Sequence, residues 1–305
     1  MTLLDELSTS ARSVAERLGA AVVTIGRDGR GSGVVIAPGK VLTNAHNLRD
    51  RSTSVTFADG RSVQATLGGS DADGDLVVLD TDTGAVDPAT WADAAPRAGD
   101  VVFALSRGGH RSRISFGLVT STDLAFEGPR GRTVEGGVEH TAPLARGSSG
   151  GPLADAHGRV VGLNTHRTGR GFYVARPADA ALRATIDQLI TGTSVVRPRL
   201  GVALAPAGVA AKLRRSVGLP ERTGLLVRGV EVGSPAAQAG LAEGDLLVAV
   251  GGAPLESADV LYAALAPAGE TLTITVVRGN DERETVVSFA ETPGDTTEDA
   301  APESV

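Results

Sequence analysis

From Ala21 onward, short β-prone runs alternate with clusters of Gly, Asp, Pro and Ser. Such spacing is typical of antiparallel strands joined by tight turns, and it favours sheets that close into barrels or sandwiches. Hydrophobic residues make up 41% of the chain but aromatic residues only 3%, so the core is expected to consist of Val, Leu, Ala and Ile. We predict a mostly β fold whose first strands lie at residues 22–25, 33–36, 55–57, 76–79, 101–105, 114–120, 160–163 and 171–175.

The length of 305 residues predicts about two domains. The first is expected at residues 21–192 and ends in a helix over 179–190. Pro198 indicates a linker at 193–198, because proline biases the preceding residue to extended backbone. The second domain, at residues 199–290, combines strands with two short helices. Residues 291–305 are acidic and cannot bury enough apolar surface to offset the entropy of ordering, so a disordered tail is expected.

An amphipathic helix is predicted at the N-terminus, within residues 1–20. Thr2 is a suitable N-cap and Gly19 a suitable stop. The simplest interpretation is that the helix packs on the following domain, and a role in oligomerisation or membrane contact is the alternative. Its apolar residues recur at helical spacing, at Leu3, Leu4, Leu7, Ala11, Val14 and Leu18.

Composition excludes several classes of protein. The formal charge of -7 falls to -2 without the tail, and no concentrated basic face is visible, so neither nucleic acid nor an anionic membrane is an expected partner. The chain has no Cys and its five His are scattered, so neither a metal nor another cofactor is expected. The N-terminus lacks the basic and apolar stretches of a signal peptide, and no run is long enough to span a membrane, which predicts a cytoplasmic location.

Three residue types that cooperate in nucleophilic catalysis occur in the order His, Asp, Ser. His46 ends the segment TNAH, Asp75 directly precedes an apolar run, and Ser149 lies in the segment GSSGGP at 147–152. Glycines beside a serine let backbone amides converge on one point and leave room for a substrate. In α/β-hydrolases the serine precedes both partners, whereas chymotrypsin-like enzymes have the order found here. On these motifs, the first 190 residues resemble a trypsin-like serine protease of the HtrA (Deg) type.

This resemblance implies a chymotrypsin-like double β-barrel and a role for each motif residue. Ser149 Oγ would attack the scissile carbonyl, and His46 would accept its proton, since an imidazole with a pKa of about 6.5 can hold and release a proton near neutral pH. Asp75 would fix the tautomer and orientation of the imidazole ring. The backbone N–H groups of Gly147 and Ser149 would form the oxyanion hole.

Neighbouring residues compete for two of these roles. Asp71 and Asp73 lie in the same charged turn as Asp75, which is preferred because it enters the apolar run directly. Ser148 adjoins Ser149, but only Ser149 precedes the paired glycines. The remaining histidines lack the TNAH context and are expected to be surface or packing residues, at His110, His140, His157 and His166.

The resemblance also predicts the substrate pocket. In trypsin-like enzymes the floor of the S1 pocket comes from the residue six positions before the nucleophile, here Pro143, which is followed by Leu144. No carboxylate is available there to pair with a basic side chain, so we predict small or aliphatic P1 residues and no cleavage after Lys or Arg. The family usually has Asn or Asp where this chain has Ser148, and a Val pair after the histidine is absent. Whether the resting loop holds its oxyanion geometry stays open.

Residues 199–290 resemble a PDZ domain of the circularly permuted kind that follows HtrA-type protease domains. The most specific stretch is GSPAAQAGLAEGD at 233–245. Leu200-Gly201-Val202 matches the loop whose consecutive N–H groups capture a chain-terminal carboxylate, and a strand with a close-packing glycine is the alternative. Leu261 and Leu265, four residues apart on a predicted helix, are expected to line the peptide groove.

Together the resemblances imply a serine endopeptidase that degrades unfolded or damaged proteins in quality control and binds polypeptide C-termini. A proteolytically idle chaperone or scaffold, and a regulatory protease dedicated to one substrate, are the alternatives. The chain ends in Glu303-Ser304-Val305, which has the general form of a PDZ ligand, so self-association through the tail stays open. A homotrimer of the kind related proteases form would need aliphatic contacts, because residues 1–56 contain no Phe, Tyr or Trp.

Overall fold

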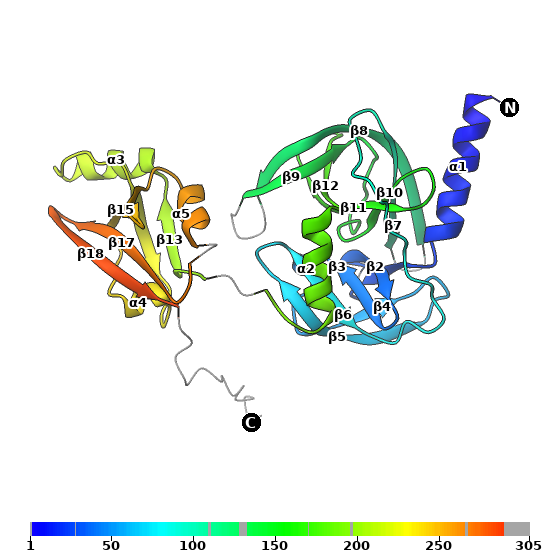
Figure 1. Ribbon diagram of the computed structural model, residues 1–305, viewed down its shortest axis with the longest axis horizontal. Coiled ribbons are helices and arrows are strands. Elements are labelled where there is room, and N and C mark those ends of the chain that lie inside the picture. The colour runs from blue at the N-terminus through cyan, green and yellow to red at the C-terminus, as the bar shows by residue number, and fades with distance from the viewer. Residues whose placement is uncertain are drawn as a thin grey trace, which may run out of the picture. The chain divides into compact units, whose positions relative to one another are not determined.

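The computed structural model describes residues 2–27, 29–108, 111–127, 133–169, 171–195, 198–265 and 268–289 (Figure 1). The chain divides into two units, Met1–Val196 and Arg197–Val305. The acidic tail predicted at 291–305 lies outside the described residues.

The first unit contains two closed antiparallel barrels of six strands each. This is the chymotrypsin-like double barrel that the sequence predicted, and the prediction is confirmed. The first barrel runs in the order β1 (Val22–Ile25), β2 (Gly31–Ala37), β3 (Lys40–Thr43), β6 (Leu76–Asp80), β5 (Ser62–Asp71) and β4 (Ser52–Thr56). The second runs in the order β10 (Pro152–Ala154), β11 (Val160–Arg167), β12 (Tyr173–Pro177), β9 (Thr133–His140), β8 (Arg111–Glu127) and β7 (Val101–Gly108).

One hydrophobic core crosses from the first barrel into the second. Buried side chains of β1, β2, β3 and β6 pack together with Phe103, Leu105 and Leu163 of the second barrel. Apart from Phe57 and Phe103, the largest fully buried side chains are Leu and Ile, as the composition predicts. The shared core fixes the two barrels against each other, and therefore also fixes the loops at their junction.

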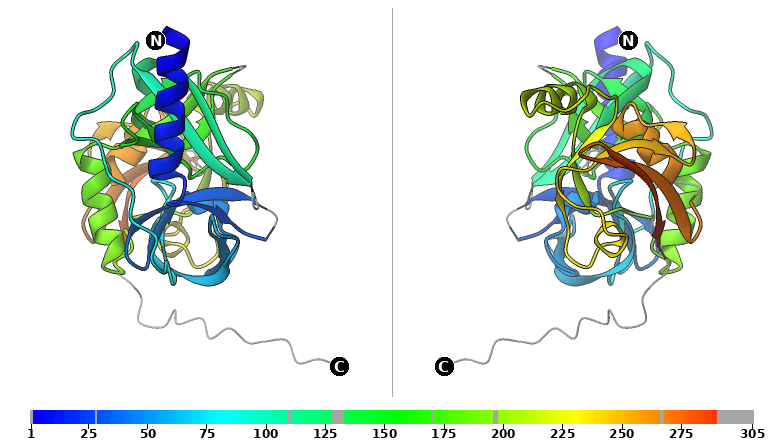
Figure 2. Two further views of the ribbon diagram at one scale, coloured as in Figure 1. Left: turned by 90° about the vertical axis from the view of Figure 1, so that its right-hand side faces the viewer. Right: turned by 90° about the vertical axis from the view of Figure 1, so that its left-hand side faces the viewer.

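Two helices cover the barrels (Figure 2). Helix α1 (Leu3–Leu18) begins with a capping box between Thr2 and Asp5. Its C-terminal half is buried at Val14 and Leu18, whereas Leu4 is 72% exposed and the N-terminal end projects from the barrels. Helix α2 (Ala180–Ile190) packs on β5 and β6 and turns three side chains inward, at Leu182, Ile186 and Leu189.

The predicted linker at 193–198 begins inside the first unit. Val195 forms an isolated bridge with Asp71, and the Ser194 hydroxyl accepts a hydrogen bond from the Ser70 N–H. The described chain is therefore still attached to the first barrel at residue 195.

The second unit is a six-stranded antiparallel sheet with helices and a core of its own. Its order is β13 (Val202–Ala205), β14 (Leu225–Val230), β15 (Leu246–Val250), β17 (Thr271–Arg278) and β18 (Asp281–Ser288), with β16 (Ala253–Pro254) paired to β15. The helices are α3 (Ala207–Ser216), α4 (Pro235–Gln238) and α5 (Ala258–Leu265). The predicted PDZ fold is confirmed, and β13 lies at the end of the sheet order.

Candidate active site

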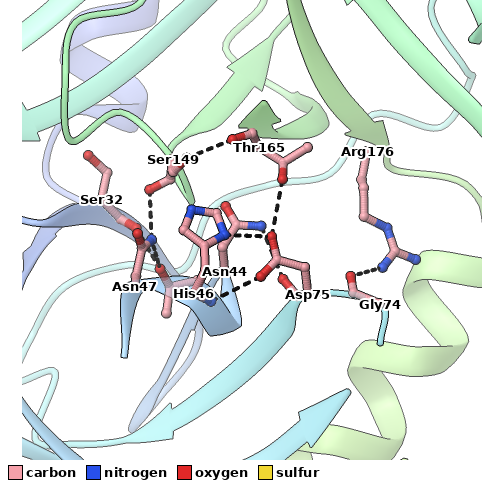
Figure 3. A network of polar contacts seen from close by, with 10 residues as sticks. Ser32, Asn44, His46, Asn47, Gly74, Asp75, Ser149, Thr165 and Arg176 are labelled. Carbon is pink, nitrogen blue, oxygen red and sulfur yellow. Dashed lines mark hydrogen bonds and ion pairs between the residues drawn. The ribbon is translucent and has the colours of Figure 1, made fainter. Parts of the chain in front are cut away.

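His46 and Asp75 meet because the strands next to them are paired. His46 lies in a short 3₁₀ helix, η1 (Ala45–Asn47), directly after β3, and Asp75 directly precedes β6. Strands β3 and β6 are neighbours, with Thr43 opposite Val77. The His46 Nδ1 lies 2.7 Å from the Asp75 Oδ2, and the His46 backbone N–H donates to Oδ1 at 3.0 Å (Figure 3).

Asp75 is held on several sides. Its side chain is 5% exposed and also accepts a hydrogen bond from the Thr165 hydroxyl at 3.2 Å. Its carbonyl accepts from the Asn44 side chain and from the Ala45 N–H. An ionised carboxylate can only accept hydrogen bonds, so the proton of a neutral His46 lies on Nδ1 and Nε2 keeps a free lone pair.

The backbone of Asp75 has a φ of 56°, and Asp75 is the non-glycine residue with positive φ in the described chain. This left-handed conformation costs about 1 kcal/mol for a residue with a Cβ, although Asp and Asn adopt it more readily than most. The turn is stabilised by its neighbours, since Asp71 accepts the Gly74 N–H at 2.9 Å and Arg176 donates to the Gly74 carbonyl. Of the competing aspartates, Asp71 holds the turn while Asp75 contacts His46.

Ser149 lies on the turn that leads into β10, and its hydroxyl donates to the Thr165 carbonyl at 2.7 Å (Figure 3). Among the hydrogen bonds of the described residues, none joins Ser149 to His46. Ser148 is buried, and its hydroxyl has no hydrogen-bond partner in the described part of the chain. The hydroxyl proton of Ser149 is thus directed away from the imidazole, and rotation of the side chain is needed before His46 can accept it.

The turn requires glycine at two positions. Gly147 and Gly150 have φ angles of 81° and 83°. A Cβ at Gly150 would also lie 2.2 Å from the Ser32 carbonyl oxygen, so no larger residue fits there. In the hydrogen bonds of the described chain, the N–H groups of Gly147 and Ser149 donate to no protein acceptor.

A cavity of about 390 Å³ joins these groups. Leu144 lines it, whereas Pro143 is exposed and its carbonyl accepts a hydrogen bond from the Ser115 hydroxyl at 2.6 Å. The predicted S1 pair is therefore split, with one residue at the cavity and one outside its lining. None of the lining residues carries a carboxylate, and they are His46, the segment 144–149, Thr165, His166, Arg167 and Tyr173.

His166 is a member of the site that the sequence did not single out. Its ring stacks on His46 with centroids 5.8 Å apart and an interplanar angle of 21°, and its other contact is edge-on to Phe126. Burial lowers the pKa of His166; nearby Asp75 raises this pKa and His46 lowers it further. Thr165 was equally missed. The one sequence signal for Thr165 and His166 is that both lie near the end of an apolar strand, β11.

His140 is outside the lining of the cavity and is fully buried. The His140 Nε2 lies 3.0 Å from the side-chain amide oxygen of Asn164, and the ring stacks on Tyr173. Burial lowers the pKa of His140 to about 4. His140 is therefore neutral at pH 7. Within the described ranges, no three His, Asp or Glu side chains are grouped so as to hold a metal ion.

Of the PDZ residues proposed from the sequence, some lie in the loop before β13 and others in the hydrophobic core of the second unit. Gly201 has a φ of 75°, and a Cβ there would lie 2.3 Å from the Ser234 Cβ, so the loop needs glycine for its conformation and for space. Val202 begins β13, while Leu200 is buried. Leu261 and Leu265 are only 2% and 6% exposed and pack in the core of the unit, and their place along the peptide groove stays a prediction.

Comparison with known families gives the same division of the chain. A family model for trypsin-like peptidase domains matches residues 31–163, and a model for PDZ domains matches residues 226–278. The fold and the site thus define a trypsin-like peptidase domain followed by a PDZ domain.

Relatives and solved structures narrow this class. The chain is 34% identical over 284 residues to a Brucella suis protein named "Probable periplasmic serine endoprotease DegP-like", covering 87% of this chain and 53% of that protein. A protein of the same name from Rhizobium meliloti is 33% identical over 301 residues, covering 90% and 57%. A structure entitled "HtrA-type protease AlgW with decapeptide" matches with a TM-score of 0.66 and 25% identity, covering 91% of this chain and 97% of that one. The chain is thus similar to HtrA-type serine proteases over most of its length.

The same relatives also bear on the length of the chain and on its location. The chain spans about half the length of the curated relatives it matches. Those relatives are named as periplasmic, and this overturns the cytoplasmic location that we predicted from the N-terminal sequence. No described helix combines the length and apolar character needed to cross a membrane.

Proposed function

We propose that the chain is a serine endopeptidase in which Ser149 is the nucleophile, His46 the general base and Asp75 the group that orients His46. The observation that carries this proposal is the 2.7 Å contact between His46 and Asp75 at the cavity that also holds Ser149. Both side chains come from loops of the first barrel, while Ser149 comes from the second.

The reaction follows from the positions of the protons. Rotation of Ser149 breaks its hydrogen bond to Thr165 and brings the hydroxyl to His46 Nε2, which accepts the proton as Oγ attacks the substrate carbonyl. The imidazolium then protonates the leaving amine as the C–N bond breaks. Water completes the cycle by attacking the acyl-enzyme, with its proton passing to His46 and then back to Ser149. Gly147 and Ser149 supply the N–H groups for the oxyanion, because neither N–H donates to another acceptor within the described residues.

The lining of the cavity supports a substrate preference. Arg146 and Arg167 lie at it and no lining residue is acidic, so a Lys or Arg side chain of a substrate finds no partner there. Leu144 provides an apolar surface. We therefore propose small or aliphatic P1 residues, and a peptide library cleaved mainly after Arg would contradict this assignment.

The PDZ unit is proposed to bind the C-termini of polypeptides. Gly201 supports this role, since its left-handed conformation is the kind that turns successive N–H groups toward one point. Among the described strands, β13 pairs with β14 alone, so its other edge can accept an extended peptide. Occupancy by the chain's own Ser304-Val305 is tested by deleting these two residues and measuring peptide affinity, and a homotrimer is tested by light scattering.

We propose unfolded or damaged polypeptides as substrates, in protein quality control. Degradation of unfolded casein by the wild type supports this, while cleavage of one partner protein alone would favour a dedicated regulatory protease.

A fluorophosphonate probe tests the nucleophile directly, because it reacts covalently with an activated serine. We expect labelling of the wild type and of Ser148→Ala, and none of Ser149→Ala. Absence of labelling and of casein cleavage in the wild type would favour an idle scaffold. Labelling that is lost in Ser148→Ala alone would move the nucleophile to the neighbouring residue.

A further inference from the structure

Ser32 of β2 holds both ends of the turn that carries the proposed nucleophile. It is fully buried in the first barrel. Its backbone N–H donates to the Ser149 carbonyl at 2.8 Å, and its hydroxyl donates to the Gly147 carbonyl at 2.8 Å. These two carbonyls flank Ser148. One residue of the first barrel thus fixes, from behind, the two peptide units next to the proposed oxyanion donors.

The direction of the Ser32 hydroxyl is set by Arg107 of β7. The Arg107 backbone N–H donates to the Ser32 Oγ at 3.1 Å. The Ser32 oxygen accepts this N–H through one of its lone pairs. Its single O–H proton is therefore donated to a different group, which must be an acceptor. The Gly147 carbonyl, at 2.8 Å, is closer than the Arg107 carbonyl, at 3.4 Å. The Gly147 carbonyl is therefore drawn toward the first barrel, while the N–H groups of Gly147 and Ser149 donate to no acceptor among the described residues.

The side chain of Arg107 extends this link to the N-terminal helix. Arg107 as a whole is 4% exposed, and no ion pair of the described residues includes its guanidinium. Instead, Nε donates to the Val22 carbonyl at 2.8 Å and Nη2 to the Gly19 carbonyl at 3.0 Å. Gly19 is the C-cap of α1 and Val22 begins β1. A positive charge at a helix C-terminus is favourable, and the planar guanidinium can serve two separate carbonyls, which an ammonium group does less well.

These contacts form a continuous chain of buried and partly buried hydrogen bonds from the end of α1, through Arg107 and Ser32, to the turn at 147–149. We propose that Ser32 and Arg107 are positioning residues that keep the oxyanion N–H groups of this turn in place, and that the anchored end of α1 is part of this support. The inference rests on the proposed peptidase function. It assigns to a buried arginine, and to the helix before the barrels, a role in the rate of the chemical step.

The first test compares Ser32→Ala with Thr24→Val. Thr24 is also buried and lies opposite Ser32 in the β1–β2 ladder, so its replacement disturbs the same part of the first barrel. Below the melting temperatures of both variants, we expect Ser32→Ala to lower kcat about 10-fold or more, because direct loss of an oxyanion donor costs about 100-fold or more. KM should stay within about twofold, and affinity for a peptide boronic acid, which mimics the tetrahedral intermediate, should fall in parallel with kcat. Thr24→Val should lower the melting temperature without this change in kcat.

Arg107→Lys and Arg107→Met test the link to α1. Both keep the backbone N–H that contacts Ser32, so they isolate the side chain. We expect kcat and boronate affinity to fall in the order wild type, Lys, Met, with KM nearly constant. If Ser32→Ala proves too unstable to assay, these milder variants decide the question.

The outcomes separate this inference from the proposed function. A wild type that fluorophosphonate does not label would remove the proposed function and the inference with it. A labelled, active wild type whose Ser32 and Arg107 variants lose only melting temperature, at unchanged kcat and boronate affinity, would overturn the inference alone.

Discussion

The two units each bury an aspartate at the start of a strand, but they surround it with different partners. In the first unit, called the peptidase unit below, Asp75 contacts His46, the Thr165 hydroxyl and backbone N–H groups. None of these groups carries a permanent charge. In the PDZ unit, Asp245 is fully buried, and both its oxygens accept hydrogen bonds from the Arg278 guanidinium, at 2.6 and 2.8 Å.

The difference shows how one residue type serves two purposes. Burial raises the pKa of Asp245, but hydrogen bonds from Arg278 and from the Ala242 N–H outweigh this, so the pKa is lowered. An arginine never gives up its proton in a protein, so this pair is a fixed structural link. In a catalytic triad the imidazole carries a second proton only transiently, so a carboxylate at the position of Asp75 stabilises the imidazolium while it exists.

The substitution Asp75→Asn is the strongest test of the difference between Asp75 and Asp245. Asn tolerates the left-handed backbone of this position, so the fold should persist while the imidazole loses its preferred tautomer. We expect kcat to fall by about 10⁴-fold, the effect of the same change in a trypsin-like triad. The measurement is peptide hydrolysis at pH 7, with Asp245→Asn as the matched control that keeps its activity. Equal losses in the two variants would contradict the division of roles.

Asp245→Asn should instead lower the stability of the PDZ unit. It weakens the charge-assisted hydrogen bonds from Arg278 and leaves buried groups less well paired, which costs about 1–3 kcal/mol in the free energy of unfolding. Urea unfolding of wild type and variant measures the difference. An unchanged urea midpoint would contradict this expectation. It would show that hydrogen bonds to water stabilise the Arg278 guanidinium, which is 48% exposed, as well as the bonds to Asp245 do.

Acid should weaken the peptidase unit before the PDZ unit. The pKa of His140 is lowered to about 4 in the folded state, so between pH 6.5 and 4 the unfolded chain binds a proton that the folded chain does not, and stability falls as the pH drops. The lowered pKa of Asp245 contributes stability that is lost only below its unfolded value near 3.8. The single Trp of the chain, Trp91, lies in the peptidase unit, so its fluorescence follows that unit alone.

His140→Gln provides the control for this acid dependence, since Gln can donate to Asn164 but does not titrate in this range. The variant should show a flatter loss of stability from pH 6.5 to 4. The same slope in wild type and variant would assign the effect to other groups.

The smallest effect is expected at an exposed ion pair. Lys40 and Asp80 are 2.5 Å apart, with side chains 23% and 45% exposed. Water screens such a pair, so Lys40→Gln should change the free energy of unfolding by about 1 kcal/mol or less. Thermal unfolding at low and high salt measures this. A loss as large as that of Asp245→Asn would contradict the contrast between buried and exposed carboxylates.

The sequence was most informative where a local motif lies next to a strand. The residues next to His46 and Asp75 in the sequence identify both as candidate catalytic residues, and the pairing of β3 with β6 brings them together. Thr165, His166 and Ser32 could not be found this way, because their contacts depend on the docking of two barrels and leave no local pattern. Leu261 and Leu265 lie on one helix, α5, as their spacing predicts, but spacing alone does not tell how deeply the two side chains are buried.

Helix α3 was not expected from the sequence at all. Its apolar residues Val209 and Leu213 are 46% and 36% exposed, whereas Ala210 and Arg214 face inward. The apolar pattern thus points away from the core, against the rule by which amphipathic helices are identified. Strands β9 and β10 were missed for other reasons, since β9 contains two adjacent glycines and β10 has only three residues.

The shared junction of the two barrels has a consequence for the order of folding. The links from Asp75 to Thr165 and from Ser32 to Gly147 join residues 90 and 115 positions apart. Contacts that close such long loops form late, after the local strand pairs of each barrel. During refolding from urea, the circular dichroism of the sheets should therefore return first and peptide hydrolysis last, so enzymatic activity reports the final docking of one barrel on the other.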